Sequence, residues 1–266
     1  MGELRAYAAL LGGKARSMAS YRTSFAIELL SNLGSTVLDV VTVFVLYRAT
    51  ARVGGFTLAE SLLMTGLTAA GFVLADLVVG NIDDLKRYVR AGTLDTVLIR
   101  PLRVLPQLIF MDLPLRKLLR LAFGIFVYVA ALVVNHVHWT PTRLTLAVVA
   151  PIGAAVFFGA IFVLTASLAF WWVESGEMGA AFTYGGRDFT SYPITIYSDW
   201  FRGVFAYALG FGLVSYQPAL ALLDRADPLG LPAWAGYAAP LVSVPAVAIA
   251  ALVWRIGIRH YRSTGS

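Results

Sequence analysis

Cysteine is absent from the 266 residues, so the chain can form no disulfide, no thiolate metal site and no cysteine nucleophile. Charge is scarce as well: only 14% of the residues are Asp, Glu, Lys or Arg, whereas 59% are apolar. The mean hydropathy of +0.75 is correspondingly high. Such values lie outside the range of soluble globular domains. The sequence therefore predicts an integral membrane protein.

Motifs for nucleotide hydrolysis and for metal binding are also missing. Gly13-Lys14 is followed by alanine and has no glycine five positions earlier, so it is not a phosphate-binding loop. His136 and His138 are close in sequence, but a metal ion would need more ligands than this pair provides. No serine, histidine and acid fall at matching membrane depths, which argues against a hydrolase. We expect no cofactor and no metal on this chain, and no ATP hydrolysis by it alone.

Six stretches are apolar and long enough to cross a bilayer, since a spanning helix needs about 20 residues. We predict an all-α, polytopic membrane protein with one transmembrane domain over residues 1–266. Residues 1–22 contain no cleavable signal peptide and are predicted to form a helix in the membrane interface. The polar stretch 174–199 is predicted to be a loop. The predicted spans are residues 25–47, 58–80, 118–134, 144–173, 201–223 and 234–258.

The distribution of cations predicts the orientation of these spans. Most of the 21 Lys and Arg residues fall near the N-terminus, in the loop 81–117 and near the C-terminus. By the positive-inside rule, both termini and this loop face the cytoplasm. The net charge of +6 is explained in this way, so no nucleic-acid partner is expected. We expect a multi-pass protein of the cytoplasmic (inner or plasma) membrane.

The loop 81–117 is the longest charged break in the chain, and part of it has helical periodicity. Gly92 would break the helix and Pro101 would stop it. Cytoplasmic loops are often basic only because positive charge orients the neighbouring spans. Orientation does not require an amphipathic helical pattern that is interrupted by glycine and proline, so the pattern in this loop needs a further explanation. It favours a bent helix that lies in water against the membrane and meets a soluble partner. The apolar positions at helical spacing are Ile82, Leu85, Tyr88, Val89, Leu94, Val97 and Leu98.

Polar residues inside the first span recur every three or four positions and so share one helix face. A carboxylate near the bilayer centre costs about 2.5–3.5 kcal/mol, so Asp39 should face protein or water. Two interpretations stay open for Asp39, a substrate path and a helix contact, whereas a structural role is favoured for Glu28 and Asp76. The candidate residues for a translocation path are Asn32, Ser35, Asp39, Thr42, Thr65 and Thr68.

Residues 90–102, which read RAGTLDTVLIRPL, resemble the cytoplasmic coupling segment of permease subunits from type-2, exporter-class ABC transporters. The similarity is to the branch with a short, six-span permease. Residues 192–202 and 216–219 resemble the segments that enter and leave its fifth span, and residues 257–266 resemble its C-terminal ending. Relatives usually carry a proline where this chain has Gly210, so a kink there would have to be made by glycine or be absent.

The resemblance implies an assembly of this chain with a second permease, identical or related, and two copies of a cytoplasmic ABC ATPase that binds ATP and Mg. In such assemblies the loop helix sits in a groove on the ATPase, and spans one and five of the two permeases meet. A short re-entrant segment, here about residues 218–240, closes the outer side. Apolar residues of the loop would fill the groove, charged ones would fix the register and Gly92 would permit the bend. The residues expected to couple are Leu85, Tyr88, Arg90, Gly92, Leu94, Asp95, Arg100 and Pro101.

The sequence thus predicts the permease of an ATP-driven exporter that moves a hydrophobic or amphipathic substrate. One alternative is an ion-coupled carrier in which Asp39 binds a proton. The other is a membrane-embedded, lipid-modifying enzyme that uses Asp39, Asp76 and the pair His136 and His138 as acid-base groups. Only the exporter requires a separate ATPase.

Overall fold

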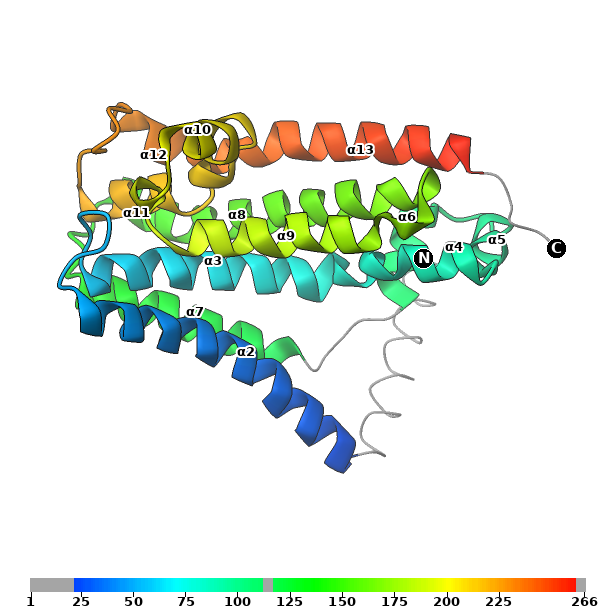
Figure 1. The fold of residues 1–266 in the computed structure, drawn as a ribbon, viewed down its shortest axis with the longest axis horizontal. Coiled ribbons are helices and arrows are strands. Elements are labelled where there is room, and N and C mark those ends of the chain that lie inside the picture. Colours follow the sequence, from blue (N-terminus) through cyan, green and yellow to red (C-terminus); the bar gives the residue numbers. More distant parts are fainter. Residues whose placement is uncertain (1–21, 112–116, 262–266) are drawn as a thin grey trace.

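The computed structural model describes residues 22–111 and 117–261, and the predicted interfacial helix at residues 1–22 falls almost wholly outside them. Long helices run along one elongated bundle (Figure 1). In the described residues all regular structure is helical apart from an isolated bridge between Val53 and Phe56, which confirms the predicted all-α class. The long helices are α2 (Arg22–Ala49), α3 (Leu58–Val79), α7 (Leu118–Val134), α8 (Pro141–Ser167), α9 (Gly176–Ser191) and α13 (Ser243–His260).

Only some of these helices are both long enough and apolar enough to be recognised as membrane spans. Within the described residues, Leu58–Arg90, Pro141–Phe170 and Trp234–His260 meet both requirements, and α7 is a shorter apolar helix. A bent pair of helical segments between residues 199 and 223 would be a fourth. The structure therefore supports a membrane-integral helical protein with three or four such helices, whereas six were predicted.

Helix α3 forms the centre of the bundle and packs against α7, α8 and α9. A capping box begins it: the Thr57 N–H donates to Glu60 Oε2 at 2.7 Å, and the Glu60 N–H donates to Thr57 Oγ1 at 3.4 Å. Small residues then allow its neighbours to approach closely. A Cβ atom on Gly71 would lie 2.4 Å from the Cβ of Ala154 on α8. This close packing accounts for the burial of α3 along most of its length.

Gly66→Ala is expected to destabilise the α3–α7 contact. A Cβ atom there would lie 2.7 Å from the Tyr128 backbone, which cannot rotate away, so we expect a loss of about 1–3 kcal/mol. The melting temperature of the purified protein, followed by size-exclusion chromatography after heating, measures the effect. Gly185→Ala on α9 is the matched control, because nothing lies within 4 Å of its added methyl group. Equal melting temperatures for the two variants would contradict this account.

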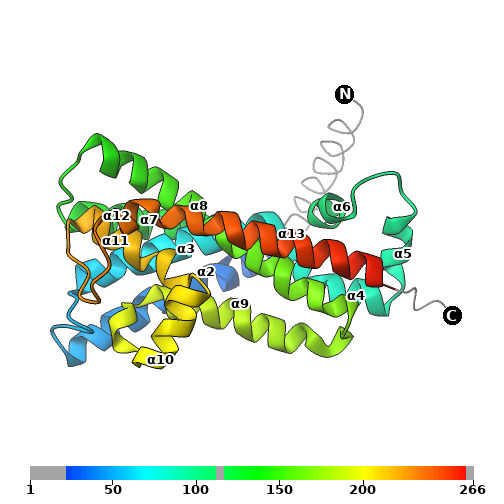
Figure 2. The ribbon, with the colours of Figure 1, turned by 90° about the horizontal axis from the view of Figure 1, so that it is seen from above.

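The stretch 174–199, predicted to be a loop, instead contains the helix α9, which lies beside α3 and α8 (Figures 1 and 2). Near its start Glu177 contacts Lys86 at 3.3 Å. Just beyond its end, Thr195 donates to the carbonyl of Gly54, at the opposite end of α3, over 2.8 Å. Helix α9 and the residues that follow it therefore extend from the α4 end of the bundle to the loop before α3.

The prediction for this stretch was wrong because the polar groups of α9 are satisfied inside the protein rather than by water. Thr65 and Thr68 of α3 donate to the carbonyls of Ser191 and Thr190, each over 2.9 Å. Thr183 shares a hydrogen bond of 3.1 Å with Thr165 of α8. Between helices such bonds stabilise packing, so a span whose polar residues face its neighbours need not be strongly apolar.

The predicted span 201–223 is bent by 68° and is not one straight helix. A short helix α10 (Asp199–Arg202) continues into a π-helical turn (Gly203–Ala208), and α11 (Tyr216–Leu223) follows after a 3-10 turn (Phe211–Leu213). Gly210 lies at the bend with φ +83°, a conformation that side chains other than glycine rarely adopt. The kink that the sequence left open is thus made by glycine.

Aromatic rings fill the inside of this bent segment. The Phe201 and Phe205 rings stack with centroids 4.3 Å apart, and Phe189 of α9 lies 4.6 Å from Tyr197. Burial raises the pKa of the Tyr197 phenol to about 12. Helix α12 (Trp234–Ala238) and a 3-10 turn (Ala239–Val242) then lead into α13 at the same end of the molecule.

Candidate functional site

The segment predicted to couple forms short helices at one end of the bundle (Figures 1 and 2). After a 3-10 turn (Gly80–Asp84) come α4 (Leu85–Arg90), α5 (Thr93–Leu98) and α6 (Val104–Met111). Gly92 separates α4 from α5 with φ +66° and has no atom within 4 Å of an added Cβ, so the backbone conformation alone favours glycine there. The break at Gly92 and the end of the helix before Pro101 agree with the sequence pattern.

The burial of the apolar residues differs from what we expected. Leu85 and Leu94 are 0% exposed, because α4 and α5 fold back on each other and turn these side chains inward. In this conformation they cannot fill a groove on a partner, and that part of the prediction is corrected. The large apolar side chains that face outward are Leu98 and Ile99, which are 37% and 83% exposed.

Ion pairs connect α4 to the beginning of α9. Arg90 pairs with Glu174, and Lys86 Nζ lies 3.3 Å from Glu177 Oε1. Each pair is exposed and contributes little to stability by itself, since the median exposed pair contributes about 0–1 kcal/mol. Their importance is geometric, because they place two of the segment's cations against the start of a helix that packs on α3 and α8.

Helix α5 is connected to the end of α13 in a similar way. The Tyr261 hydroxyl donates to Asp95 Oδ1 at 3.2 Å, and its ring lies against Phe170 with centroids 6.2 Å apart. The rings of Trp171 and His260 stack beside them at 5.8 Å. Asp95, which was predicted to fix the register of the ATPase, therefore contacts a residue of its own chain. Of the other predicted coupling residues, Arg100 and Pro101 are exposed and Tyr88 is half-buried.

The six residues predicted for a translocation path do not come together. Thr65 and Thr68 are buried helix contacts, and Thr42 donates to the carbonyl of Leu38 on its own helix over 2.8 Å. The side chains of Asn32 and Ser35 lie outside the part of the chain that the structure describes.

Asp39 pairs with Arg187, which the sequence analysis did not single out. The guanidinium of Arg187 also lies 5.4 Å from the centre of the Phe72 ring and 3.5 Å from Asp188. Arg187 is 8% exposed, and its Nε atom is buried without a hydrogen-bond partner in the described structure. The sequence did contain a signal for this contact, because Arg187 is a lone arginine in a stretch that is long enough to form a helix. It was missed because the stretch 174–199 was interpreted as a loop.

The buried carboxylate of Asp76 joins α3 to α7. Lys117 Nζ lies 2.6 Å from Asp76 Oδ1, and Arg120 Nη1 lies 3.5 Å from Asp76 Oδ2. Asp76 is 2% exposed and Arg120 is 8% exposed. Two cations compensate one buried carboxylate here, which agrees with the structural role favoured for Asp76 from the sequence.

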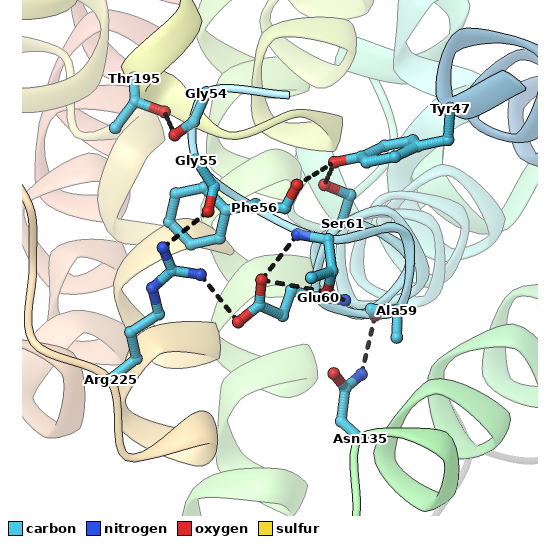
Figure 3. A network of polar contacts seen from close by, with 11 residues as sticks. Tyr47, Gly54, Gly55, Phe56, Ala59, Glu60, Ser61, Asn135, Thr195 and Arg225 are labelled. Carbon is cyan, nitrogen blue, oxygen red and sulfur yellow. Dashed lines mark hydrogen bonds and ion pairs between the residues drawn. The ribbon is translucent and has the colours of Figure 1, made fainter. Parts of the chain in front are cut away.

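A polar network connects the segments at the end of the bundle where α3 begins (Figure 3). Arg225 donates to Glu60 Oε1 at 2.7 Å and to the carbonyl of Gly55 at 2.8 Å, and its guanidinium lies 3.9 Å from the centre of the Phe56 ring. Asn135 donates to the carbonyl of Ala59 at 2.7 Å. These contacts connect the loop before α3 to the segments that follow α7 and α11.

No group of three or more histidine, aspartate or glutamate residues that could hold a metal ion occurs among the described residues. Residues 33–265 match the family described as ABC-2 family transporter protein. No curated protein and no solved structure matches the chain.

Proposed function

Because the chain belongs to the ABC-2 transporter family, we propose that it is the permease of an ATP-driven exporter. Membrane components of this family are generally not enzymes and typically pair with ABC ATPase components. In the proposed assembly, two ATPase subunits bind ATP and Mg, and this chain pairs with a second permease that is identical or related. The scarcity of buried charge favours a hydrophobic or amphipathic substrate.

The observation that carries this proposal is the α4–α5 surface. It exposes the apolar Leu98 and Ile99 next to Arg100, and α4 adds the exposed cation Arg87, at one end of a bundle of apolar helices. An apolar centre with a charged rim is typical of a surface that binds another protein. The same segment is connected to α9 and α13, so a partner that moves it would act on both helices.

We further propose that α2, α3, α7, α8, α9 and α13 are the six membrane crossings. In this topology α9 replaces residues 201–223 as the fifth crossing, and α10 to α12 lie at the outer end. The cations of α4, Arg100 just after α5 and Arg259 in the last turn of α13 gather at the other end. The positive-inside rule then places that end, and both termini, in the cytoplasm.

Transport in this proposal begins when ATP closes the ATPase dimer and displaces α4 and α5. The pairs Arg90–Glu174 and Lys86–Glu177 transmit the displacement to α9, and the Asp95–Tyr261 contact transmits it to α13. Helix α2 presents large exposed apolar side chains along its outer face, among them Leu38 and Val45. This face suits a lipid or the second permease.

Two observations weigh against the alternatives. An ion-coupled carrier would need Asp39 to exchange protons, whereas Asp39 is already paired with the buried Arg187. A lipid-modifying enzyme would need its acid-base groups close together. Asp76 is instead held by Lys117 near the α4 end of α3, whereas His136 follows α7 at the opposite end.

Changing Ile99→Asp together with Arg100→Glu is expected to lower co-purification of the cognate ATPase by about tenfold or more, as loss of central interface residues does. The ATPase activity that depends on the permease should fall in parallel. Both side chains point outward, so insertion and the melting temperature should not change.

Two control variants make this experiment specific. Arg52→Glu alters an exposed cation at the opposite end of α3 and should leave ATPase binding unchanged. Tyr261→Phe removes the hydroxyl that donates to Asp95 and should spare ATPase binding while reducing transport. Full ATPase binding by the Ile99→Asp, Arg100→Glu protein would refute the assignment of this surface.

A further inference from the structure

A cavity of about 450 Å³ lies between α3, α6, α8 and α13. Its volume falls within the range of small-ligand sites, about 300–1,000 Å³. Every residue that lines it is a glycine or has an apolar side chain. Val78, Ile152, Val156 and Val247 line it and are 42–51% exposed, so the cavity opens sideways as a groove on the surface of the bundle.

Small residues on two neighbouring helices create this space. Ala155, Gly159 and Ala160 of α8 face Ala250 and Ala251 of α13 across the groove. A Cβ atom on Gly159 would meet only Val79 Cγ2, at an ordinary contact distance of 3.5 Å. Larger side chains would therefore fit here, and the chain leaves the volume open.

Among the described residues, two cations lie near one end of the groove. Leu105 and Ile109 of α6 line that end, and the carbonyl of Arg103 accepts the first backbone hydrogen bond of α6, from Gln107 at 3.3 Å. Arg255 lies one helical turn beyond Ala251 on α13. Both arginines are exposed, and neither forms an ion pair with another described residue. The other end is bounded by Pro240, which packs against Gly153.

We propose that this groove binds one acyl chain of an anionic phospholipid, with the lipid phosphate between Arg103 and Arg255. The lining offers no hydrogen-bonding side chain, so the bound portion must be hydrocarbon. The unpaired cations at the mouth select a negatively charged headgroup, since each cation near an anionic membrane surface contributes to lipid binding. In the proposed topology the lipid comes from the cytoplasmic leaflet.

The bound lipid would contact the coupling segment through α6. The Gln107 amide donates to the carbonyls of Val97 at 3.4 Å and Leu102 at 3.0 Å, and Asn81 donates to the carbonyl of Leu108 at 2.8 Å. An acyl chain against Leu105 and Ile109 therefore stabilises the position of α6 relative to α5. This consequence rests on the proposed function, whereas lipid binding does not.

Native mass spectrometry of the purified chain, titrated with phosphatidylglycerol or phosphatidylcholine, tests the site. The unaltered protein should retain one phosphatidylglycerol in preference to phosphatidylcholine. Arg103→Gln and Arg255→Gln should each weaken phosphatidylglycerol binding about fivefold, and together they should remove the preference. Arg52→Gln, at the opposite end of the molecule, should change nothing.

Two further variants test the groove itself. Gly159→Phe and Ala251→Leu should each lower the retention of both lipids, because they occupy the space of the acyl chain. An unchanged lipid count in a folded groove variant would overturn the proposal. Failure of the Arg103→Gln, Arg255→Gln protein to lose its preference would overturn it as well, and this variant alters only exposed side chains. A change in oligomeric mass without lipid loss would assign the groove to a protein contact instead.

Discussion

Exchanging the charges of Asp39 and Arg187, as Asp39→Arg with Arg187→Asp, is expected to restore much of the stability that either single reversal removes. The two residues pair between α2 and α9, and Arg187 is 8% exposed. Each single reversal places two like charges together inside the bundle. Breaking a fully buried pair costs about 3–5 kcal/mol, and an unpaired charge at the bilayer centre costs about 2.5–3.5 kcal/mol on insertion scales; the Asp39 side chain is 28% exposed, so we expect the lower end of these ranges.

The yield of monodisperse protein and its melting temperature measure this effect. Asp188→Asn is the control, because Asp188 lies 3.5 Å from Arg187 but its side chain is 66% exposed. Little change is expected there. If the double reversal is as unstable as the single ones, the Asp39–Arg187 pair does not hold α2 to α9.

An apolar replacement of both residues separates the two interpretations of Asp39. Asp39→Leu with Arg187→Met leaves no charge unpaired, and such replacements of buried pairs are often neutral or stabilising. We expect this protein to be stable. If it also transports normally, the pair is only a helix contact, and if transport is lost, the charges belong to the translocation path.

The second large effect is expected for Asp76→Asn. This change leaves Lys117 and Arg120 facing each other without their carboxylate, at a site where Asp76 is 2% exposed. We expect a loss of about 3–5 kcal/mol, since the change breaks the buried ion pairs that Asp76 forms with both cations. A fall in melting temperature and in the fraction of membrane-inserted protein would report it.

Glu177→Gln provides the matched control for this prediction. Glu177 also pairs with a lysine, Lys86, but its side chain is 93% exposed. Its loss should cost less than about 1 kcal/mol. Equal effects of the two variants would mean that burial does not determine the strength of these ion pairs.

The sequence alone was sufficient for several features. Few charges and many apolar residues predicted a membrane-integral, all-helical protein, and residues 90–102 indicated the family to which the chain belongs. Gly92 was correctly placed at a helix break. These are local properties, because each can be recognised within one or two dozen residues of sequence. They are the transfer of apolar residues into a bilayer, helical periodicity and the conformational freedom of glycine.

Other features depended on tertiary packing. Helix α9 was missed because Thr183, Thr190 and Ser191 form hydrogen bonds with α3 and α8, so the polarity of these positions carries no sign of exposure to water. Leu85 and Leu94 have the spacing of an interface, but the fold of α4 against α5 buries them. Asp39 finds its partner 148 residues away in Arg187. Hydropathy and periodicity indicate which strongly apolar segments leave water, and the cation pattern predicts their orientation. Which polar groups meet inside the bundle is decided only by how the helices pack, because that pairing joins residues that no local pattern relates.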